Sequence, residues 1–422
     1  MNKKICKELI SIAFPAMGEN LLQMLMGMVD SYLVASLGIV ALSGVSIANN
    51  LLAVYQAVFI ALAAAVSSQL AHVVGKEKGM QITAIVTDSV KLTVYVGVFL
   101  GILAVMLGPT LLTSLGAERE VAQLGGLYLI LVGGSILLLG LMTCLGGILR
   151  TLGQPRYPMY ISLFSNLLNA VFSAIAVFVL HTGVAGVAFG TILSRIVGCG
   201  LLWSRLSISI KPSTWSVDKE LVRLALPAIG ERLMMRAGDV VIVGMITGLG
   251  TAVVAGNAIG ETITQFNYMP TLGISVATLI MTAKSRQDSL AVQRIYRIGL
   301  GLSLIFMFVI GGISYFAGPL LISLFTMDVQ VAQASQTVLL YSVLGVPFTA
   351  ATLVFTGLWQ GMGNARLPFY ATGIGMWVVR IGLAYFLIKN FQLGLPSIWL
   401  ATIVDNAFRA SLLYVRYRYS TG

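Results

Sequence analysis

The chain consists of long apolar stretches separated by short breaks that contain glycine, proline or charged residues. Apolar stretches of about 20 residues or more are long enough to cross a bilayer as α-helices. We therefore predict an all-α integral membrane protein with twelve transmembrane helices. They are expected at residues 9–34, 45–70, 84–108, 121–147, 157–181, 184–206, 218–247, 251–282, 295–317, 331–358, 367–389 and 394–414.

The hydrophobic pattern occurs twice along the chain. LISIAFPAMGENL at 9–21 and LVRLALPAIGERL at 221–233 are identical at seven of thirteen positions. Internal repeats in an apolar chain are typical of transporters that move one half against the other. We predict two pseudo-symmetric six-helix lobes around a central cavity, at 1–206 and 220–422, joined by a polar cytoplasmic linker at 207–219. Because each half has an even number of spans, the two repeats are expected to be parallel.

Composition and charge agree with a membrane protein. Hydrophobic residues make up 58% of the 422 positions and charged residues 10%, against about a quarter charged in a soluble domain. With the N-terminus inside, most basic residues fall in cytoplasmic segments, and the outer loops keep little beyond Arg119 and Lys389. This asymmetry predicts a multi-pass plasma-membrane protein with both termini in the cytoplasm. The net charge of +11 is therefore not interpreted as a nucleic-acid-binding surface.

Other chemistries find little support in the sequence. The three cysteines are spaced for neither a disulfide framework nor a zinc site. The glycine-rich segments contain no phosphate-binding fingerprint of the type G-x(4)-GK-[ST]. We therefore expect no cofactor and no bound ATP, an ion gradient as the energy source, and a monomer.

Polar groups on the first helix are the strongest candidates for function. An ionisable group in hydrocarbon costs at least about 2.5–3.5 kcal/mol, and Glu19, Gln23 and Asp30 share one helix face. No basic residue of the same span can neutralise either carboxylate. Each is then neutral, bound to a cation, or in a fixed ion pair with an arginine of another helix. We predict that Asp30 and Glu19 couple transport to a cation.

The second repeat carries related groups. Glu231 is the repeat mate of Glu19, and Pro15 and Pro227, which precede them by four residues, are predicted to bend their helices. Glu261 aligns with Asn49, and flexible methionines and aromatic rings near these positions suit apolar cations. The expected cavity lining comprises Glu231, Glu261, Gln23, Asn49, Tyr55, Gln56, Met28, Met235, Gln265 and Tyr268.

A second set of charges has a structural interpretation. Asp405 and Arg409 lie four residues apart on one helix, and Arg195 and Arg380 are candidates to join them. For Arg236 and Asp239, an internal pair and a functional role remain equally open.

Several of these residues resemble a known family. Pro15, then Val29-Asp30, then Leu37-Gly38 is similar to the first-helix pattern of multidrug and toxic compound extrusion (MATE) transporters of bacterial or archaeal type. The segment 147–153 resembles their R-x-x-G turn, and Asn166 with Asn169 their paired asparagines. The resemblance implies proton- or sodium-coupled export of cationic, amphipathic compounds, with Asp30, Asn166 and Asn169 in the cation site.

The chain also departs from the family. Met235 stands where some members carry an acid two turns after the helix-seven proline. A sodium ion at Asp30 is compatible with the polar groups of the first lobe, but a proton requires only one carboxylate. Because these second-lobe acids are missing, we expect the proton.

Three other functions are weighed against a secondary exporter. A lipid-linked oligosaccharide flippase of the same superfamily normally has fourteen helices and a cationic cavity, unlike this chain. An intramembrane enzyme needs catalytic or metal-binding residues at one depth, and the two peripheral histidines do not provide them. A purely structural membrane protein gives no reason for carboxylates within the first span.

Overall fold

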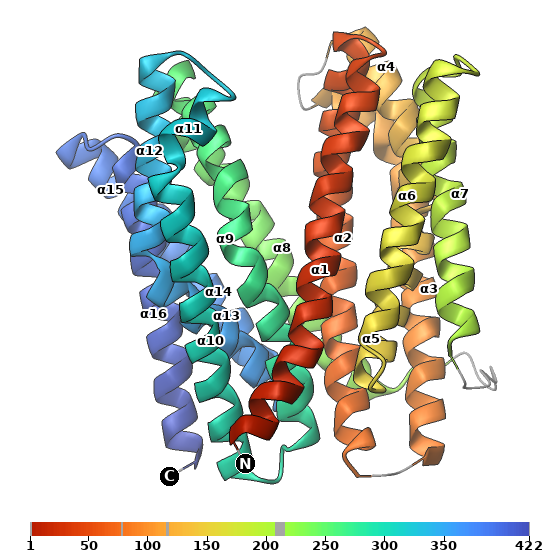
Figure 1. The fold of residues 1–422 in the computed structure, drawn as a ribbon, viewed down its shortest axis with the longest axis vertical. Coiled ribbons are helices and arrows are strands. Elements are labelled where there is room, and N and C mark those ends of the chain that lie inside the picture. The colour runs from red at the N-terminus through yellow and green to blue at the C-terminus, as the bar shows by residue number, and fades with distance from the viewer. Residues whose placement is uncertain (1, 77–78, 115–117, 207–215, 422) are drawn as a thin grey trace. The chain divides into compact units, whose positions relative to one another are not determined.

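The computed structural model describes residues 2–76, 79–114, 118–206 and 216–421. The predicted linker at 207–219 therefore lies largely outside the described residues. Within these ranges every regular element is helical (Figure 1). The helices of the first repeat are α1 (Asn2–Ala35), α2 (Ile39–Val74), α3 (Gly79–Ser114), α4 (Arg119–Tyr128), η1 (Leu129–Gly133), α5 (Ile136–Thr151), α6 (Arg156–Phe178) and α7 (Gly183–Ser204).

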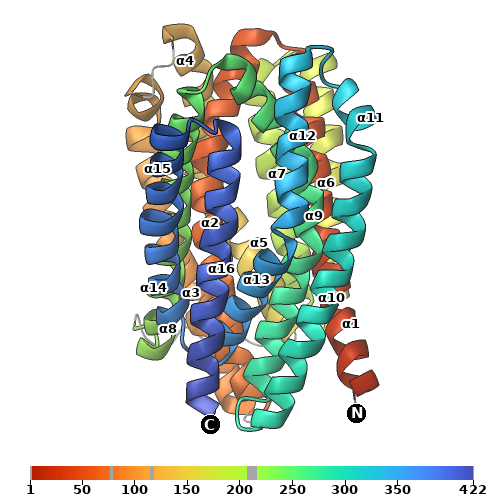
Figure 2. The same ribbon diagram turned by 90° about the vertical axis from the view of Figure 1, so that its left-hand side faces the viewer.

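The second repeat repeats this order. Its helices are α8 (Lys219–Thr247), α9 (Thr251–Lys284), α10 (Ser289–Phe316), α11 (Gly318–Ser323), α12 (Val329–Leu344), α13 (Val346–Gly361), α14 (Arg366–Gly373), η2 (Ile374–Arg380), α15 (Ile381–Phe391) and α16 (Leu395–Thr421). In the first repeat α2 packs against α3, α4 and α5, and α6 packs against α7. In the second, α9 packs against α10, α12 and α13, and α13 packs against α16 (Figure 2).

The helices account for all twelve predicted spans. In the described part of the chain, eight are long and apolar enough to cross a membrane alone. Two further spans are broken: α4 and η1 meet α5 at 45°, and α12 meets α13 at 58°. The long helices α8 and α9 supply the remaining two, and both carry more polar residues. The predicted twelve-helix architecture is confirmed.

The duplication is visible in the backbone itself. Gly38 and Gly250, which precede α2 and α9, have φ angles of 110° and 111°. Gly153 and Gly363, after α5 and α13, have φ angles of 89° and 78°. Side-chain-bearing residues rarely adopt such angles. The same turn geometry is therefore built by the same residue at equivalent places of both repeats.

The chain forms two compact units. The first lobe is Gly18–Ala225, and the second lobe is Met1–Met17 together with Leu226–Gly422. This division differs from the expected boundary at 207–219. Each repeat begins in the lobe of the other one and changes lobe within its first helix, next to Pro15 in α1 and Pro227 in α8.

Tertiary packing explains why the start of α1 belongs to the second lobe. A Cβ atom added to Gly273 of α9 would lie 2.7 Å from the carbonyl oxygen of Ala13. Leu9, Ile12 and Ala13 are buried. A glycine opposite α1 thus permits a backbone approach that the periodicity of α1 alone cannot reveal. Whether Pro15 and Pro227 bend their helices stays a prediction.

Gly357 of α13 should be among the glycines least tolerant of a side chain. Its added Cβ would lie 2.5 Å from the backbone oxygen of Ser275, whereas that of its repeat mate Gly147 would lie 3.1 Å from the Ser67 hydroxyl. A hydroxyl can rotate away, but a backbone oxygen moves only with its helix. We expect Gly357→Ala to lower the free energy of unfolding by about 1–3 kcal/mol, and Gly147→Ala by less.

Thermal unfolding of both variants in detergent measures this difference. Equal losses, or a larger loss for Gly147→Ala, would contradict the packing described for α9 and α13.

Candidate functional site

Asp30 and Asn169 meet in the first lobe. Asn169 Nδ2, on α6, donates hydrogen bonds to both carboxylate oxygens of Asp30, at 3.0 and 3.1 Å. The other end of the amide, Asn169 Oδ1, accepts from Ser173 Oγ at 3.3 Å and Thr191 Oγ1 at 3.2 Å. In this orientation the amide nitrogen faces Asp30, which suits an ionised carboxylate because that group only accepts. Asp30 is thus held by a neutral partner.

No fixed ion pair neutralises Asp30 in the described part of the chain. Arg195 of α7 is the cation that interacts electrostatically with Asp30. No cationic nitrogen of the described residues lies within 4.0 Å of the Asp30 carboxylate. The buried Tyr128 interacts electrostatically with both groups. The ion-pair partners of Asp405 among the described residues are Arg380 and Arg409, so the suggestion that Arg195 joins this group stays a prediction.

Asn166 is near the site in sequence but is not joined to Asp30 by any hydrogen bond among the described residues. Its Nδ2 is buried without a partner in that part of the structure. Sequence reasoning named Asn166 and Asn169 together and missed Thr191, Ser173 and Tyr128. Residues 191 and 195 lie one turn apart on α7, and that polar spacing was the available signal.

Glu19 has an ionic partner from another helix. Arg150 Nη1, on α5, lies 2.5 Å from Glu19 Oε2, and the two side chains are only 12% and 17% exposed. The fixed ion pair, one of the alternatives for Glu19, is what the structure contains. Between Glu19 and Asp30, Gln23 accepts a hydrogen bond from Gln56 at 3.3 Å. The polar face of α1 is therefore divided among three different partners.

Glu231 occupies the equivalent place in the second lobe, with neutral partners. Gln360 Nε2 donates to Glu231 Oε2 and Thr372 Oγ1 to Glu231 Oε1, both at 3.3 Å. Gln360 follows Arg150 at the repeat offset of 210 residues. The arginine that pairs with Glu19 is thus replaced by an amide opposite Glu231. Glu231 is only 4% exposed, which differs from the expected cavity-lining position because α13 and α14 cover it.

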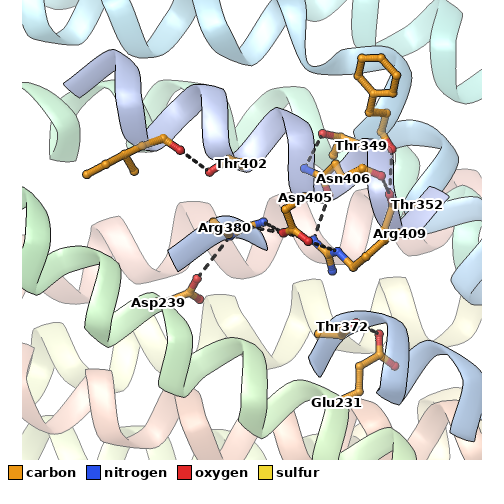
Figure 3. Close-up of polar contacts among 12 residues, drawn as sticks. Glu231, Asp239, Thr349, Thr352, Thr372, Arg380, Thr402, Asp405, Asn406 and Arg409 are labelled. Carbon is orange, nitrogen blue, oxygen red and sulfur yellow. Dashed lines mark hydrogen bonds and ion pairs between the residues drawn. The ribbon is translucent and has the colours of Figure 1, made fainter. Parts of the chain in front are cut away.

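Asp405 is the centre of an ion cluster in the second lobe (Figure 3). Arg380 Nη2 lies 2.7 Å from Asp405 Oδ2, and Arg409 Nε lies 2.9 Å from Asp405 Oδ1. Asp405 is 0% exposed. Arg380 also lies 3.9 Å from Asp239, which approaches Arg236 at 4.0 Å. Buried charges require such pairing, which supports the structural interpretation of Asp405, Arg409 and Arg380.

The remaining candidates of the predicted cavity differ in exposure. Exposed side chains belong to Gln23, Met28, Asn49, Glu261 and Gln265, whereas Gln56, Met235 and Tyr268 are half-buried and Tyr55 is buried. The hydroxyl oxygens of Tyr268 and Ser342 lie 3.2 Å apart. Glu261 is an exposed residue of α9, and its carboxylate interacts with the buried Asn257. The assignment of these side chains to one cavity stays a prediction.

Comparisons with known proteins identify what this arrangement resembles. The MatE family model matches residues 15–175 and again residues 227–386. A protein of Thermotoga maritima named "Probable multidrug resistance protein NorM" is 31% identical over 97% of this chain and 91% of its own length. The "Uncharacterized transporter YisQ" of Bacillus subtilis is 22% identical over 97% of this chain and 93% of its own.

Solved structures share the fold. A multidrug resistance MATE family transporter of the MOP superfamily, in an outward-facing conformation, superposes with a TM-score of 0.92 at 21% identity. A MOP superfamily transporter from Pyrococcus furiosus superposes with a TM-score of 0.91 at 21% identity. In both, the match covers 99% of this chain and 96% of the other. The two matches of one family model start 212 residues apart, which confirms the duplication predicted from the sequence.

Proposed function

The chain belongs to the MatE family of membrane transporters, and from that premise we propose that it is a secondary active multidrug exporter. It expels cationic or amphipathic small molecules by alternating access, in exchange for a proton or a sodium ion bound at Asp30. One observation carries this proposal. A carboxylate within a membrane-spanning helix is held by the neutral Asn169, and no cationic nitrogen of the described residues lies within 4.0 Å of it.

Such a carboxylate suits ion coupling. The charge of the Asp30 site changes when a cation binds, whereas Asp405 is already paired with Arg380 and Arg409. A ligand shifts a conformational equilibrium only if it binds one state better than another. A buried charge in low dielectric makes that difference large. Binding and release of a cation at Asp30 therefore drive the alternation of the two lobes.

The substrate class follows from the exposed groups. Glu261 provides a negative charge at the surface of α9, and Met28 provides a flexible apolar contact on α1. The Thermotoga maritima relative is named for multidrug resistance, which supports varied substrates. The protein is a multi-pass membrane protein, and we place it in the plasma membrane as a monomer with both termini cytoplasmic. It needs neither ATP nor a cofactor.

Efflux of a fluorescent cation from vesicles tests the proposal. Vesicles containing the protein should export the dye when a pH or sodium gradient is imposed, without ATP. A protein that only moves lipid-linked oligosaccharides, an intramembrane enzyme or a structural protein would give no gradient-dependent signal above that of empty vesicles.

Glu261→Gln should selectively weaken the binding of cationic substrates. The substitution removes a negative charge and keeps the shape of the side chain, so a monovalent cation should bind about five- to tenfold more weakly. A neutral compound of similar size should bind as before, and Glu261→Asp, which keeps the charge, should retain the preference. Competition against the fluorescent cation measures both affinities. Equal losses for charged and neutral compounds would instead indicate a packing role for Glu261.

A further inference from the structure

Arg195 is a half-buried cation that the predicted coupling site did not include. It lies on α7 one turn after Thr191, whose hydroxyl binds the same Asn169 that holds Asp30. Its guanidinium interacts electrostatically with Asp30 and Tyr128. Arg195 Nη1 is buried and has no hydrogen-bond partner in the part of the chain that the structure describes. A guanidinium stays protonated in proteins, so a positive charge with an unused donor is permanently present near Asp30.

The groups around Asp30 fit a sodium ion poorly. A hard cation requires several oxygen ligands directed at it, but Asn169 presents its amide nitrogen to both oxygens of Asp30. The carbonyl oxygen of Asn169 already accepts from Ser173 and Thr191. In the described structure the amide that contacts Asp30 thus presents a donor and not an acceptor to it, and the carboxylate is the anionic oxygen source of the site.

We propose that Arg195 is the internal counter-ion of ionised Asp30. Its positive charge compensates the carboxylate, as the charge of a bound sodium ion would otherwise do. The inference rests on the proposed function and deepens it, because it names the proton as the coupling ion. When Asp30 binds a proton, the carboxylate is neutral and Arg195 keeps its charge. When Asp30 releases the proton, Arg195 compensates the carboxylate, and no metal ion is required.

The groups that interact with Asp30 agree with this role. Asp30 on α1 interacts electrostatically with Tyr128 on α4 and Arg195 on α7, and it accepts hydrogen bonds from the neutral Asn169 on α6. Of the described residues, Arg195 is the charged group that interacts with Asp30. Removing its charge leaves the ionised carboxylate without compensation. Asp30 then keeps its proton to higher pH, and above that pH a sodium ion can replace the lost counter-ion.

The test compares Arg195→Gln with Arg195→Lys, which keeps a positive charge. In reconstituted vesicles, the midpoint of the pH dependence of efflux should move upward by about one unit in Arg195→Gln, a tenfold lower proton concentration. Arg195→Lys should move it less. The unfolding temperature of the purified protein at alkaline pH, in sodium chloride against choline chloride, reports sodium binding through linkage.

Sodium should stabilise Arg195→Gln but not the wild type, and the double variant Asp30→Asn/Arg195→Gln should lose the effect. An unshifted pH midpoint and no sodium response in Arg195→Gln would overturn the proposal. If that variant does not fold, the wild type still decides: sodium stabilisation that Asp30→Asn abolishes would show that sodium binds despite Arg195. These outcomes are separate from the proposed function, which fails if the wild type shows no gradient-driven efflux or if Asp30→Asn retains it.

Discussion

Asp30→Asn should abolish efflux driven by an ion gradient, lowering its rate at least about a hundredfold, and should leave the protein folded. An amide cannot take up and release a proton, so the variant cannot alternate between the two charge states. Its side-chain oxygen can still accept from Asn169 Nδ2, which lies 3.0 Å from Asp30 Oδ1 in the wild type. The loss of transport therefore reflects coupling and not assembly.

Dye efflux in vesicles and thermal unfolding in detergent measure both parts of this result. Asp328→Asn is the matched control, because Asp328 caps α12 through the backbone nitrogens of Gln330 and Val331. Asparagine is a good N-cap residue, so this variant should transport as the wild type does. A folded Asp30→Asn protein with wild-type efflux would remove Asp30 from the mechanism.

The second large effect is on stability, at Asp405. Asp405→Asn leaves Arg380 and Arg409, both buried, without their shared counter-charge. Breaking a buried pair by removing one partner costs about 3–5 kcal/mol. We expect a loss of that size in the free energy of unfolding, measured in detergent, and poor recovery of folded protein.

Glu231→Gln is the control for burial alone. Glu231 is also buried, but its direct partners Gln360 and Thr372 are neutral. A glutamine can accept from Gln360 through its oxygen and donate to the Thr372 hydroxyl through its nitrogen, so the loss in free energy of unfolding should stay below about 1–2 kcal/mol. If both variants lose the same stability, the arginines do not depend on Asp405.

Much of the fold could be predicted because apolar length and repetition are properties of the sequence itself. The twelve spans were predicted from the length of the apolar stretches. The duplication was predicted from the similarity between the stretches near 9–34 and 218–247 and between their equivalents. The breaks inside the spans at 121–147 and 331–358 were not predicted, because the glycines and the proline at these places do not by themselves distinguish a break from a continuous helix such as α9, which contains Pro270. The change of lobe next to Pro15 and Pro227 depends on packing between helices, which no local pattern contains.

The candidate site was predictable only in part, for a related reason. Helical spacing places Glu19 and Asp30 on one face of α1, but it does not identify their partners on other helices. Glu19 pairs with Arg150, and Asp30 accepts hydrogen bonds from Asn169. The repeat held one unused signal, since aligning Arg150 with Gln360 predicts different partners for Glu19 and Glu231. Arg195 was considered only as a partner of Asp405 and not of Asp30, because spacing along α7 defines a face of the helix and not the neighbour of that face.

Exchange of substrate for an ion is the central claim, and a vesicle experiment without any imposed gradient tests it most directly. Purified protein is reconstituted into vesicles with equal pH and sodium on both sides, and a cationic substrate is added outside. Inward movement of the substrate should expel protons, so the lumen should become more alkaline, and Asp30→Asn vesicles should show no change. Accumulation of substrate with neither proton nor sodium movement would contradict the account.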